Sequence, residues 1–203
     1  MSESLRLLVR AATIGAALAI LAPVAAQQAA APTKENPIRF TAFNVSMPTG
    51  ISGVTLITIE RWTTPAERKS LLALVETSTR GQKGQSKLLN ALQDIKPRVG
   101  FMKTANSLGW DLRYAVENKL PDGMRQIVVA TDKPVSFAAA TSGARVMEYP
   151  FTLIEMRMKP GGEGEGRMLS ATSISVKNGR LELENYGTEP VQLTKITEEH
   201  VTK

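Results

Sequence analysis

Residues 110–132 read WDLRYAVENKLPDGMRQIVVATD, and this stretch decides the fold class of the 203-residue chain. It contains two runs rich in β-branched and aromatic residues, Trp110–Leu120 and Met124–Asp132. Pro121-Asp122-Gly123 lies between them, and Pro and Gly at such positions are typical of a tight turn. The stretch therefore predicts an antiparallel β-hairpin.

The first run alternates between apolar and polar residues, as a strand with one buried face does. One face of this predicted strand carries Trp110, Leu112, Tyr114 and Val116, and the other carries Asp111, Arg113, Ala115 and Glu117. The alternation predicts a half-buried antiparallel strand.

Similar runs on both sides of this hairpin predict six further strands, at Ile38–Met47, Val54–Trp62, Pro150–Met158, Arg167–Val176, Arg180–Tyr186 and Val191–Thr197. Asn178-Gly179 predicts a type I′ hairpin, because these residues readily adopt the two positive φ angles of that turn. The glycine-rich segment 161–166 contains two glutamates and precedes a strand rather than a helix. We therefore interpret it as a flexible hairpin connection and not as a phosphate-binding loop.

Two helices are predicted between the second strand and residue 99. Thr64-Pro65-Ala66-Glu67 has the capping box of a helix start, with a Pro at the first helical position, and this helix runs to about Ser78. A glycine-rich basic loop follows at Arg80–Gln85. A second helix is predicted from Ser86 to about Ile95, where Pro97 stops it.

Together these elements predict an α+β, mainly β protein. Its sheet is expected to be largely antiparallel, with eight or nine strands curled into a sandwich or partial barrel and a two-helix insertion after the second strand. Strands and crossover helices do not alternate, so a parallel sheet is not expected.

The first residues predict export. Arg6 and Arg10 precede an apolar run from Ala11 to Ala22, and small residues follow, which is typical of a cleaved secretory signal peptide at 1–26. Cleavage is expected after Ala26, with Ala31 as the alternative. The apolar run is too short to span a bilayer, so no stable membrane anchor is expected after cleavage. Residues 27–36 are expected to form a flexible lead-in and residues 37–203 one globular β-rich domain, exported to the periplasm or the extracellular space.

Composition excludes several kinds of site. The chain has no cysteine, which rules out disulfides, a lipid anchor on cysteine and thiolate chemistry. His200 is the single histidine, so one chain cannot build a histidine triad or a multi-histidine metal site. Without the signal peptide, 23 basic and 18 acidic residues remain, and they are interleaved along the chain. Because no basic groove pattern is present, we expect no nucleic-acid partner.

Charged residues on strands that otherwise look apolar are the candidate ligand-binding residues. They are Arg61, Asp111, Arg113, Tyr114, Glu155 and Arg157, and no catalytic residue, metal ligand or cofactor is predicted. Glu155 and Arg157 share a strand face with Phe151 and Leu153, so the pair could lie inside a barrel and hold a polar ligand group. Alternatively Thr152, Ile154, Met156 and Met158 form the buried face and the pair is an ion pair in solvent; this interpretation is favoured.

The segment 107–134, with its SLGWDLRYA, LPDG and ATDKP motifs, resembles a group of exported bacterial proteins with no assigned function. Residues 149–157, 164–166 and 183–186 are similar to the same group. The resemblance implies a bacterial envelope or secreted protein, and it transfers no catalytic or binding residue.

Three functions remain open from the sequence. The first is a non-enzymatic binding protein that takes a small apolar or amphipathic ligand in a cavity or on an open face of the sheet, oriented by Arg113 or Arg157. The second is a periplasmic hydrolase that uses paired carboxylates, among Glu60, Asp111, Asp132 and Glu155, on a glycan or ester. The third is an envelope scaffold that binds another protein through a sheet edge. The oligomeric state is not predicted.

Overall fold

The computed structural model describes residues 31–45, 52–77, 82–105, 107–135, 148–177, 180–185 and 189–202. They belong to one unit of the chain, Ala31–Lys203, and the preceding unit, Met1–Ala30, lies outside the described residues together with the predicted signal peptide. Among the described residues, neither helix contains an apolar stretch of the length that spans a bilayer.

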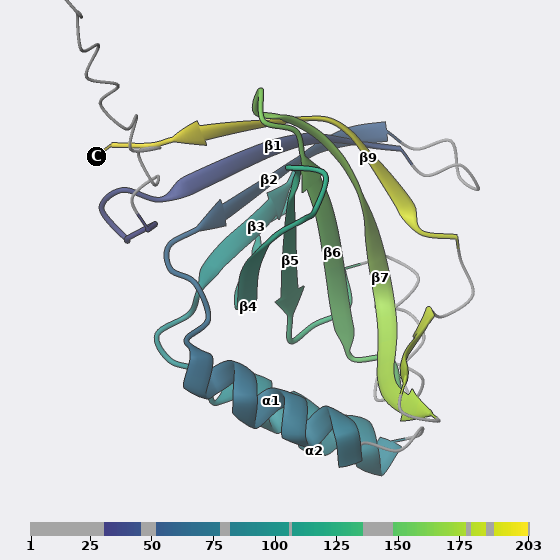
Figure 1. Ribbon diagram of the computed structural model, residues 1–203. Coiled ribbons are helices and arrows are strands. Elements are labelled where there is room, and N and C mark those ends of the chain that lie inside the picture. Colours follow the sequence, from purple (N-terminus) through teal and green to yellow (C-terminus); the bar gives the residue numbers. More distant parts are fainter. Residues whose placement is uncertain are drawn as a thin grey trace, which may run out of the picture. The chain divides into compact units, whose positions relative to one another are not determined.

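The strands form one antiparallel sheet that closes on itself (Figure 1). Its order is β6-β5-β4-β3-β2-β1-β9-β7-β8, and an additional pairing of β6 with β7 closes eight of these strands into a barrel. The ninth, β8, pairs with the end of β7 beyond the closure. The helices α1 and α2 follow the second strand, and they lie side by side beneath the sheet in Figure 1. The predicted fold class is thus confirmed.

Most predicted elements lie within a few residues of their expected bounds. The strands are β1 (Ile38–Val45), β2 (Ser52–Ile59), β3 (Gly100–Thr104), β4 (Trp110–Lys119), β5 (Arg125–Thr131), β6 (Phe151–Met158), β7 (Glu163–Lys177), β8 (Arg180–Asn185) and β9 (Val191–His200). The helices are α1 (Pro65–Thr77) and α2 (Gln82–Gln93). The predicted turn at Asn178-Gly179 lies outside the described residues.

The helix starts differ in how well they were predicted. The capping box before α1 is confirmed: the Thr64 backbone N–H donates to Glu67 Oε2 at 2.8 Å, and the Glu67 N–H donates to Thr64 Oγ1 at 3.2 Å. The start of α2 was predicted wrongly, because it begins at Gln82 and not at Ser86. Two glycines in this stretch had suggested a loop, but the buried side chain of Gln85 is held by the sheet and favours the helix.

Side chains from all eight strands fill the inside of the barrel. They alternate with outward-facing residues, and the largest of them have almost no accessible surface: Phe40, Ile57, Ile59, Met102, Leu112, Ile127, Ile154, Met156, Met158, Leu193 and Ile196. A barrel of eight strands has an interior just wide enough for side chains to fill. In the described residues the barrel interior is therefore filled by the hydrophobic core.

One ion pair crosses this core near the open ends of β5 and β9. Arg125 is bonded to Glu198, whose side chain is 8% exposed, although β5 and β9 are not neighbours in the sheet. Glu117 lies 3.6 Å from the Arg125 guanidinium, and His200 lies 3.6 Å from Glu198. Glu198 shares its strand face with the core residue Ile196, so the pair connects two opposite walls of the barrel from the inside.

A bulge in β4 corrects the predicted faces of that strand. Leu112 is opposite Thr131, but Tyr114 is opposite Ala130, so Arg113 is an extra residue without a partner across the ladder. Leu112 and Ala115 therefore both face the core, with no exposed surface, while Tyr114 and Val116 lie on the outer face. A bulge moves all later side chains to the opposite face, which an uninterrupted alternation does not anticipate.

The glycine-rich segment is also different from the prediction. β7 begins at Glu163, so residues 163–166 form a strand, and a flexible connection was the wrong interpretation for them. A Cβ on Gly166 would overlap the carbonyl oxygen of Glu155 on β6, and a Cβ on Gly164 would lie 2.6 Å from the carbonyl oxygen of Arg157. Glycine is needed here because the two strands approach each other closely.

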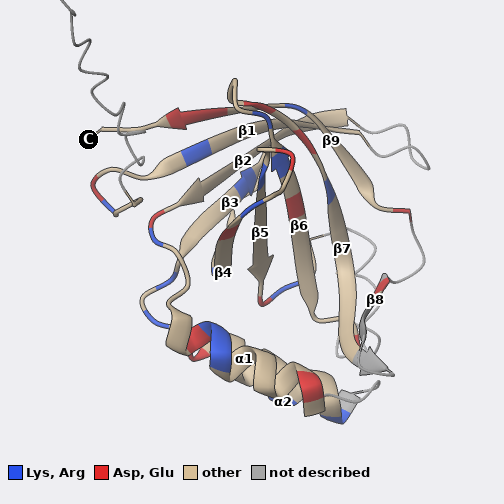
Figure 2. Ribbon diagram, viewed as in Figure 1, with Lys and Arg blue, Asp and Glu red and all other residues tan. Residues whose placement is uncertain are grey.

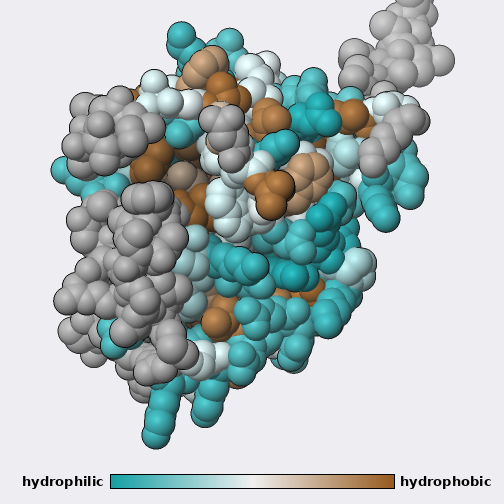
Figure 3. Space-filling view, turned by 180° about the vertical axis from the view of Figure 1, so that it is seen from behind, coloured by the Kyte–Doolittle hydropathy of each residue, from teal (hydrophilic) through white to brown (hydrophobic). Residues whose placement is uncertain are grey.

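Basic and acidic residues are both spread over the strands and helices of the described chain (Figure 2). Seen from behind, hydrophobic residues form small patches between hydrophilic ones (Figure 3). Large apolar side chains that are clearly exposed among the described residues are Phe43, Leu72, Leu108 and Leu183. Leu72 and Leu183 both line the groove described next.

Candidate functional site

A groove lies between the helix pair and the outer face of β5, β6 and β7, with a volume of about 380 Å³. On β5 its lining residues Gln126, Val128 and Ala130 alternate with the core residues Ile127 and Val129. The groove is therefore outside the barrel. Its volume is within the range of about 300–1,000 Å³ that small-molecule sites have.

The wall of the groove is apolar. The sheet contributes Val128, Leu153 and Leu169, and the helices contribute Leu72, Val75 and Leu92. Leu72 is 50% exposed, so the groove opens to solvent along α1. An apolar surface of this kind binds the apolar part of a molecule through the hydrophobic effect.

The rim of the groove is polar, and its centre is Glu155 on β6. The Gln126 amide donates to Glu155 Oε1 at 2.7 Å, and Arg167 Nη2 lies 2.8 Å from Glu155 Oε2. Asn118 in turn donates to the Gln126 side-chain oxygen at 3.2 Å. Burial acts to raise the pKa of Glu155, but the hydrogen bonds from Gln126 and Arg167 outweigh it and hold the pKa below its usual value. Glu155 is thus a carboxylate at neutral pH.

Arg68 and Tyr114 also line the groove, from α1 and β4. Within the described part of the chain, Arg68 has no ion-pair partner, so its guanidinium is available to a ligand. Burial raises the pKa of Tyr114, which remains a neutral hydroxyl donor at neutral pH. With Arg167, these residues place two cations and one carboxylate around the groove, and this balance favours an anionic or polar ligand group.

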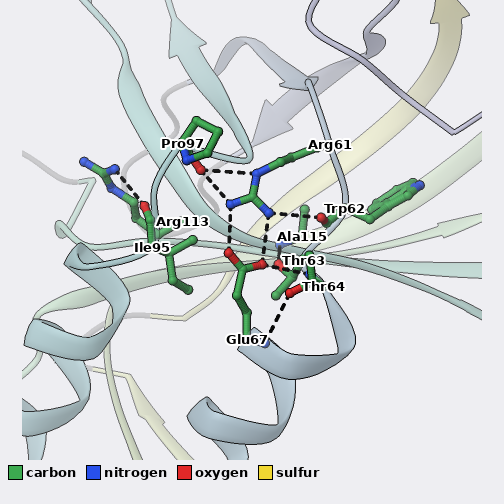
Figure 4. Close-up of polar contacts among 9 residues, drawn as sticks. All are labelled: Arg61, Trp62, Thr63, Thr64, Glu67, Ile95, Pro97, Arg113 and Ala115. Carbon is green, nitrogen blue, oxygen red and sulfur yellow. Dashed lines mark hydrogen bonds and ion pairs between the residues drawn. The ribbon is translucent and has the colours of Figure 1, made fainter.

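Arg61 holds the helix pair in position (Figure 4). Its guanidinium donates to both carboxylate oxygens of Glu67, at 2.9 and 3.0 Å, and Nη2 donates to the Pro97 carbonyl at 2.6 Å. The start of α1 is thereby connected to the chain that follows α2. A hydrogen bond from Arg61 holds the pKa of Glu67 below its usual value, so the ion pair persists in mildly acidic solution.

The other end of the helix pair is fixed by Gln85 on α2. The Ile174 N–H of β7 donates to Gln85 Oε1 at 2.9 Å, and Gln85 Nε2 donates to the Ile174 carbonyl at 2.7 Å. One side chain thus pairs with the strand backbone through both an acceptor and a donor. Together with Arg61, this contact sets the distance between helices and sheet, and hence the width of the groove.

The six predicted ligand-binding residues lie in three places. Tyr114 and Glu155 line the groove, and Arg157 lies beside it, with its Nε 3.5 Å from Glu155. Glu155 and Arg157 alternate with the core residues Ile154, Met156 and Met158, so the favoured prediction that this pair faces away from the core is confirmed. The pair does not lie in open solvent as expected, because Glu155 is 19% exposed and is bonded more closely to Arg167 than to Arg157. Arg61 lies away from the groove wall and bonds Glu67 and the Pro97 carbonyl. Asp111 and Arg113 belong to a separate charged cluster.

That cluster lies near the start of β4. Arg98 is bonded to Glu60 and to Asp111, at 3.0 and 2.8 Å, and its guanidinium carbon is 5.0 Å from the centre of the Phe101 ring. Arg113 Nη2 is 3.3 Å from Asp111, and its Nε is 3.7 Å from Asp132. This buried Nε has no hydrogen-bond partner among the described residues. Each carboxylate of the cluster is thus beside an arginine, which is typical of a structural ion-pair network.

Sequence reasoning missed Arg68, Gln126 and Arg167. Gln126 and Arg167 gave no sign of their role, because a single polar residue on a strand is usually solvated. A usable signal was present in β5 and β6: Val128, Ala130 and Leu153 are apolar residues on the face opposite to the core. Strands with apolar residues on both faces need a cover on the outer side, and the two helices provide it.

No family model matches the sequence, and comparisons with curated proteins and with solved structures also give no match.

Proposed function

We propose that this protein is an exported, non-enzymatic binding protein, and that the groove takes a small amphipathic molecule. The observation that carries the proposal is the division of the groove into an apolar wall and a polar rim. The apolar part of the ligand would contact Val128 and Leu153, and its polar group would reach Arg167 or Arg68. The sequence of residues 1–26 supports export, since it has the pattern of a signal peptide.

A hydrolase with two carboxylates receives less support. Among the described residues, Glu155 is the carboxylate that lines the groove, and it is bonded to Arg167 and Gln126. Glu165 lies beside the groove, but it stands opposite Arg157 on the neighbouring strand, so it too is next to an arginine. General acid-base chemistry requires a second carboxyl group in the same cleft, with a different pKa. The remaining candidates, Glu60, Asp111 and Asp132, lie in the cluster around Arg98 and Arg113.

The proposal is tested by titration with the neutral apolar probe N-phenyl-1-naphthylamine, followed by its fluorescence. Leu153→Trp fills the groove from the sheet, and Leu72→Lys adds a charge to it from α1. We expect both to weaken binding by about tenfold or more, since each removes apolar contact or introduces a charge that must be desolvated. Phe43→Lys is the matched control, because Phe43 is 49% exposed, as Leu72 is at 50%, and does not line the groove.

Equal affinity in the wild type and both groove variants would contradict the proposal, and so would an equal loss in Phe43→Lys. Native mass spectrometry of the protein from its own host provides an independent measurement. A bound small molecule that is absent from Leu153→Trp would support the groove as its site and identify it.

A further inference from the structure

A second hollow adjoins the groove, and its lining indicates which headgroup the ligand of the groove carries. This polar hollow lies over the outer face of β6, β7 and β9 and has a volume of about 410 Å³. Glu155 and Arg167 line both the groove and the polar hollow. The two spaces therefore adjoin at this ion pair.

The lining changes from apolar to polar at the point where they meet. Beyond Glu155 and Arg167, the polar hollow has side chains of Arg157, Glu165, Gln192 and Thr194. A ligand that extends from the groove into this space needs a headgroup that forms several hydrogen bonds. A simple carboxylate at the end of a chain would leave most of these groups without a partner.

The polar hollow is lined by two acidic and two basic side chains, which face each other in pairs across β6 and β7. Glu155 is directly opposite Arg167, and Arg157 is directly opposite Glu165, so acidic and basic residues alternate on both β6 and β7 (Figure 2). Two guanidinium groups and two carboxylates give no net charge. Such a set suits a headgroup that has both an anionic part and hydrogen-bond donors or a cation.

Both arginines can still bind a ligand. The side chain of Arg157 is 53% exposed and that of Arg167 is 57% exposed. The contact of Arg157 with Glu155 is long, with 3.5 Å between Nε and Oε1. Guanidinium groups bind phosphate through two parallel hydrogen bonds, which makes phosphate the anion that these residues match best. The carboxylates beside them accept hydrogen bonds from hydroxyl or ammonium groups.

The volume of the groove also limits the length of the ligand's apolar chain. If a methylene group takes up about the volume of a water molecule, about 30 Å³, the groove holds roughly a dozen methylenes, which is one acyl chain and not two. We infer that the ligand is a single-chain amphiphile with a phosphate-bearing headgroup, its chain in the groove and its phosphate between Arg157 and Arg167. This inference rests on the proposed function of the groove.

The test compares three amphiphiles with the same tetradecyl-length chain: myristoyl lysophosphatidylcholine, myristate and tetradecyl maltoside. For each amphiphile, displacement of N-phenyl-1-naphthylamine from the purified protein is measured below its micelle concentration. We expect the lysophospholipid to bind most tightly. Arg157→Gln removes a charge-assisted bond outside the groove, so it should weaken the lysophospholipid about tenfold and leave myristate within about twofold. Arg39→Gln, at an ion pair on β1 and β9, is the control and should change neither affinity.

The outcomes separate the headgroup from the groove. If Leu153→Trp weakens all three amphiphiles but Arg157→Gln leaves the lysophospholipid unchanged, the headgroup inference is overturned and the proposed function stands. If Leu153→Trp has no effect on any of them, the proposed function fails as well. The last measurement is calorimetry with inorganic phosphate. If the protein binds phosphate as tightly as the lysophospholipid, and Arg157→Gln weakens both equally, the site binds the free anion and the lipid assignment is overturned.

Discussion

The ion pair inside the barrel makes a prediction about stability that can be worked out from its surroundings. Glu198→Gln removes one charge and keeps the shape of the side chain. Glu198 is 8% exposed and Arg125 is 27% exposed, so the substitution leaves a guanidinium in a largely desolvated place. Breaking a buried ion pair on one side typically costs about 3–5 kcal/mol.

The expected loss is at or below the lower end of that range. Arg125 keeps Glu117 at 3.6 Å and retains some contact with water. We therefore expect the free energy of unfolding to fall by about 2–3 kcal/mol, because Glu117 compensates part of the charge. For a domain of this size each 1 kcal/mol lowers Tm by about 2–4 °C, which gives a fall of roughly 4–12 °C.

The assay is urea denaturation followed by circular dichroism, for Glu198→Gln, Arg125→Met and the double variant. The double-mutant cycle should give a coupling energy of about 2 kcal/mol or more, because both residues act in one buried contact. Glu199 is the next residue on β9 and pairs with Arg39 on the outside, with side chains 57% and 38% exposed. The matched cycle on this exposed pair should give less than about 1 kcal/mol.

The reasoning is refuted if the Arg125–Glu198 coupling is no larger than that of the Arg39–Glu199 pair. Arg125→Met combined with Glu198→Leu gives a further check. This variant replaces the pair by apolar side chains and should restore stability to within about 1 kcal/mol of the wild type, since the most buried charge is removed and Glu117, at 25% exposed, keeps contact with water.

Three more predictions concern the rest of the fold. Thr64→Ala removes one half of the capping box and should lower stability by about 0.5–2 kcal/mol in urea denaturation, while an unchanged midpoint would mean that the cap is dispensable. Gly166→Ala should lower Tm by several degrees, because its Cβ would overlap the Glu155 carbonyl, whereas Gly161→Ala, with nothing within 4 Å, should leave Tm nearly unchanged; equal effects would contradict the close approach. The pKa of Glu155 is lowered in the folded state, so its stabilising contribution is present above the unfolded pKa near 4.5 and is lost as the pH falls through the folded pKa. Glu155→Gln should therefore reduce stability at pH 7 more than at pH 3, and an equal loss at both would argue against an ionised Glu155.

The fold could be predicted in large part because its signals are local. Thr64 and Glu67 lie three residues apart, and a capping box depends on nothing beyond these residues and the backbone between them. The bulge at Arg113 could not be predicted in this way. It is defined by how β4 pairs with β5, and a single sequence does not show that pairing.

The candidate site was harder to predict because it is assembled from distant parts of the chain. Arg68, Gln126 and Arg167 come from a helix and two strands, and their proximity depends on the closure of the barrel between β6 and β7. Tyr114 and Glu155 were identified for their chemistry, without information on which residues lie near them. Spacing along one strand shows which residues share a face, but it does not show what packs on that face.

The filled barrel has a consequence for how this protein can change. Its folding core and its groove share strands but use opposite faces of them: Val129 supports the barrel, and its neighbours Val128 and Ala130 contact the groove. Exposed residues of the groove, such as Leu72 and Leu183, can therefore be exchanged for larger, smaller or more polar ones at little cost to the core, whereas its buried lining residues, such as Phe151 and Leu92, belong to the core. The barrel is a scaffold on which new binding preferences can be selected, one outward-facing position at a time.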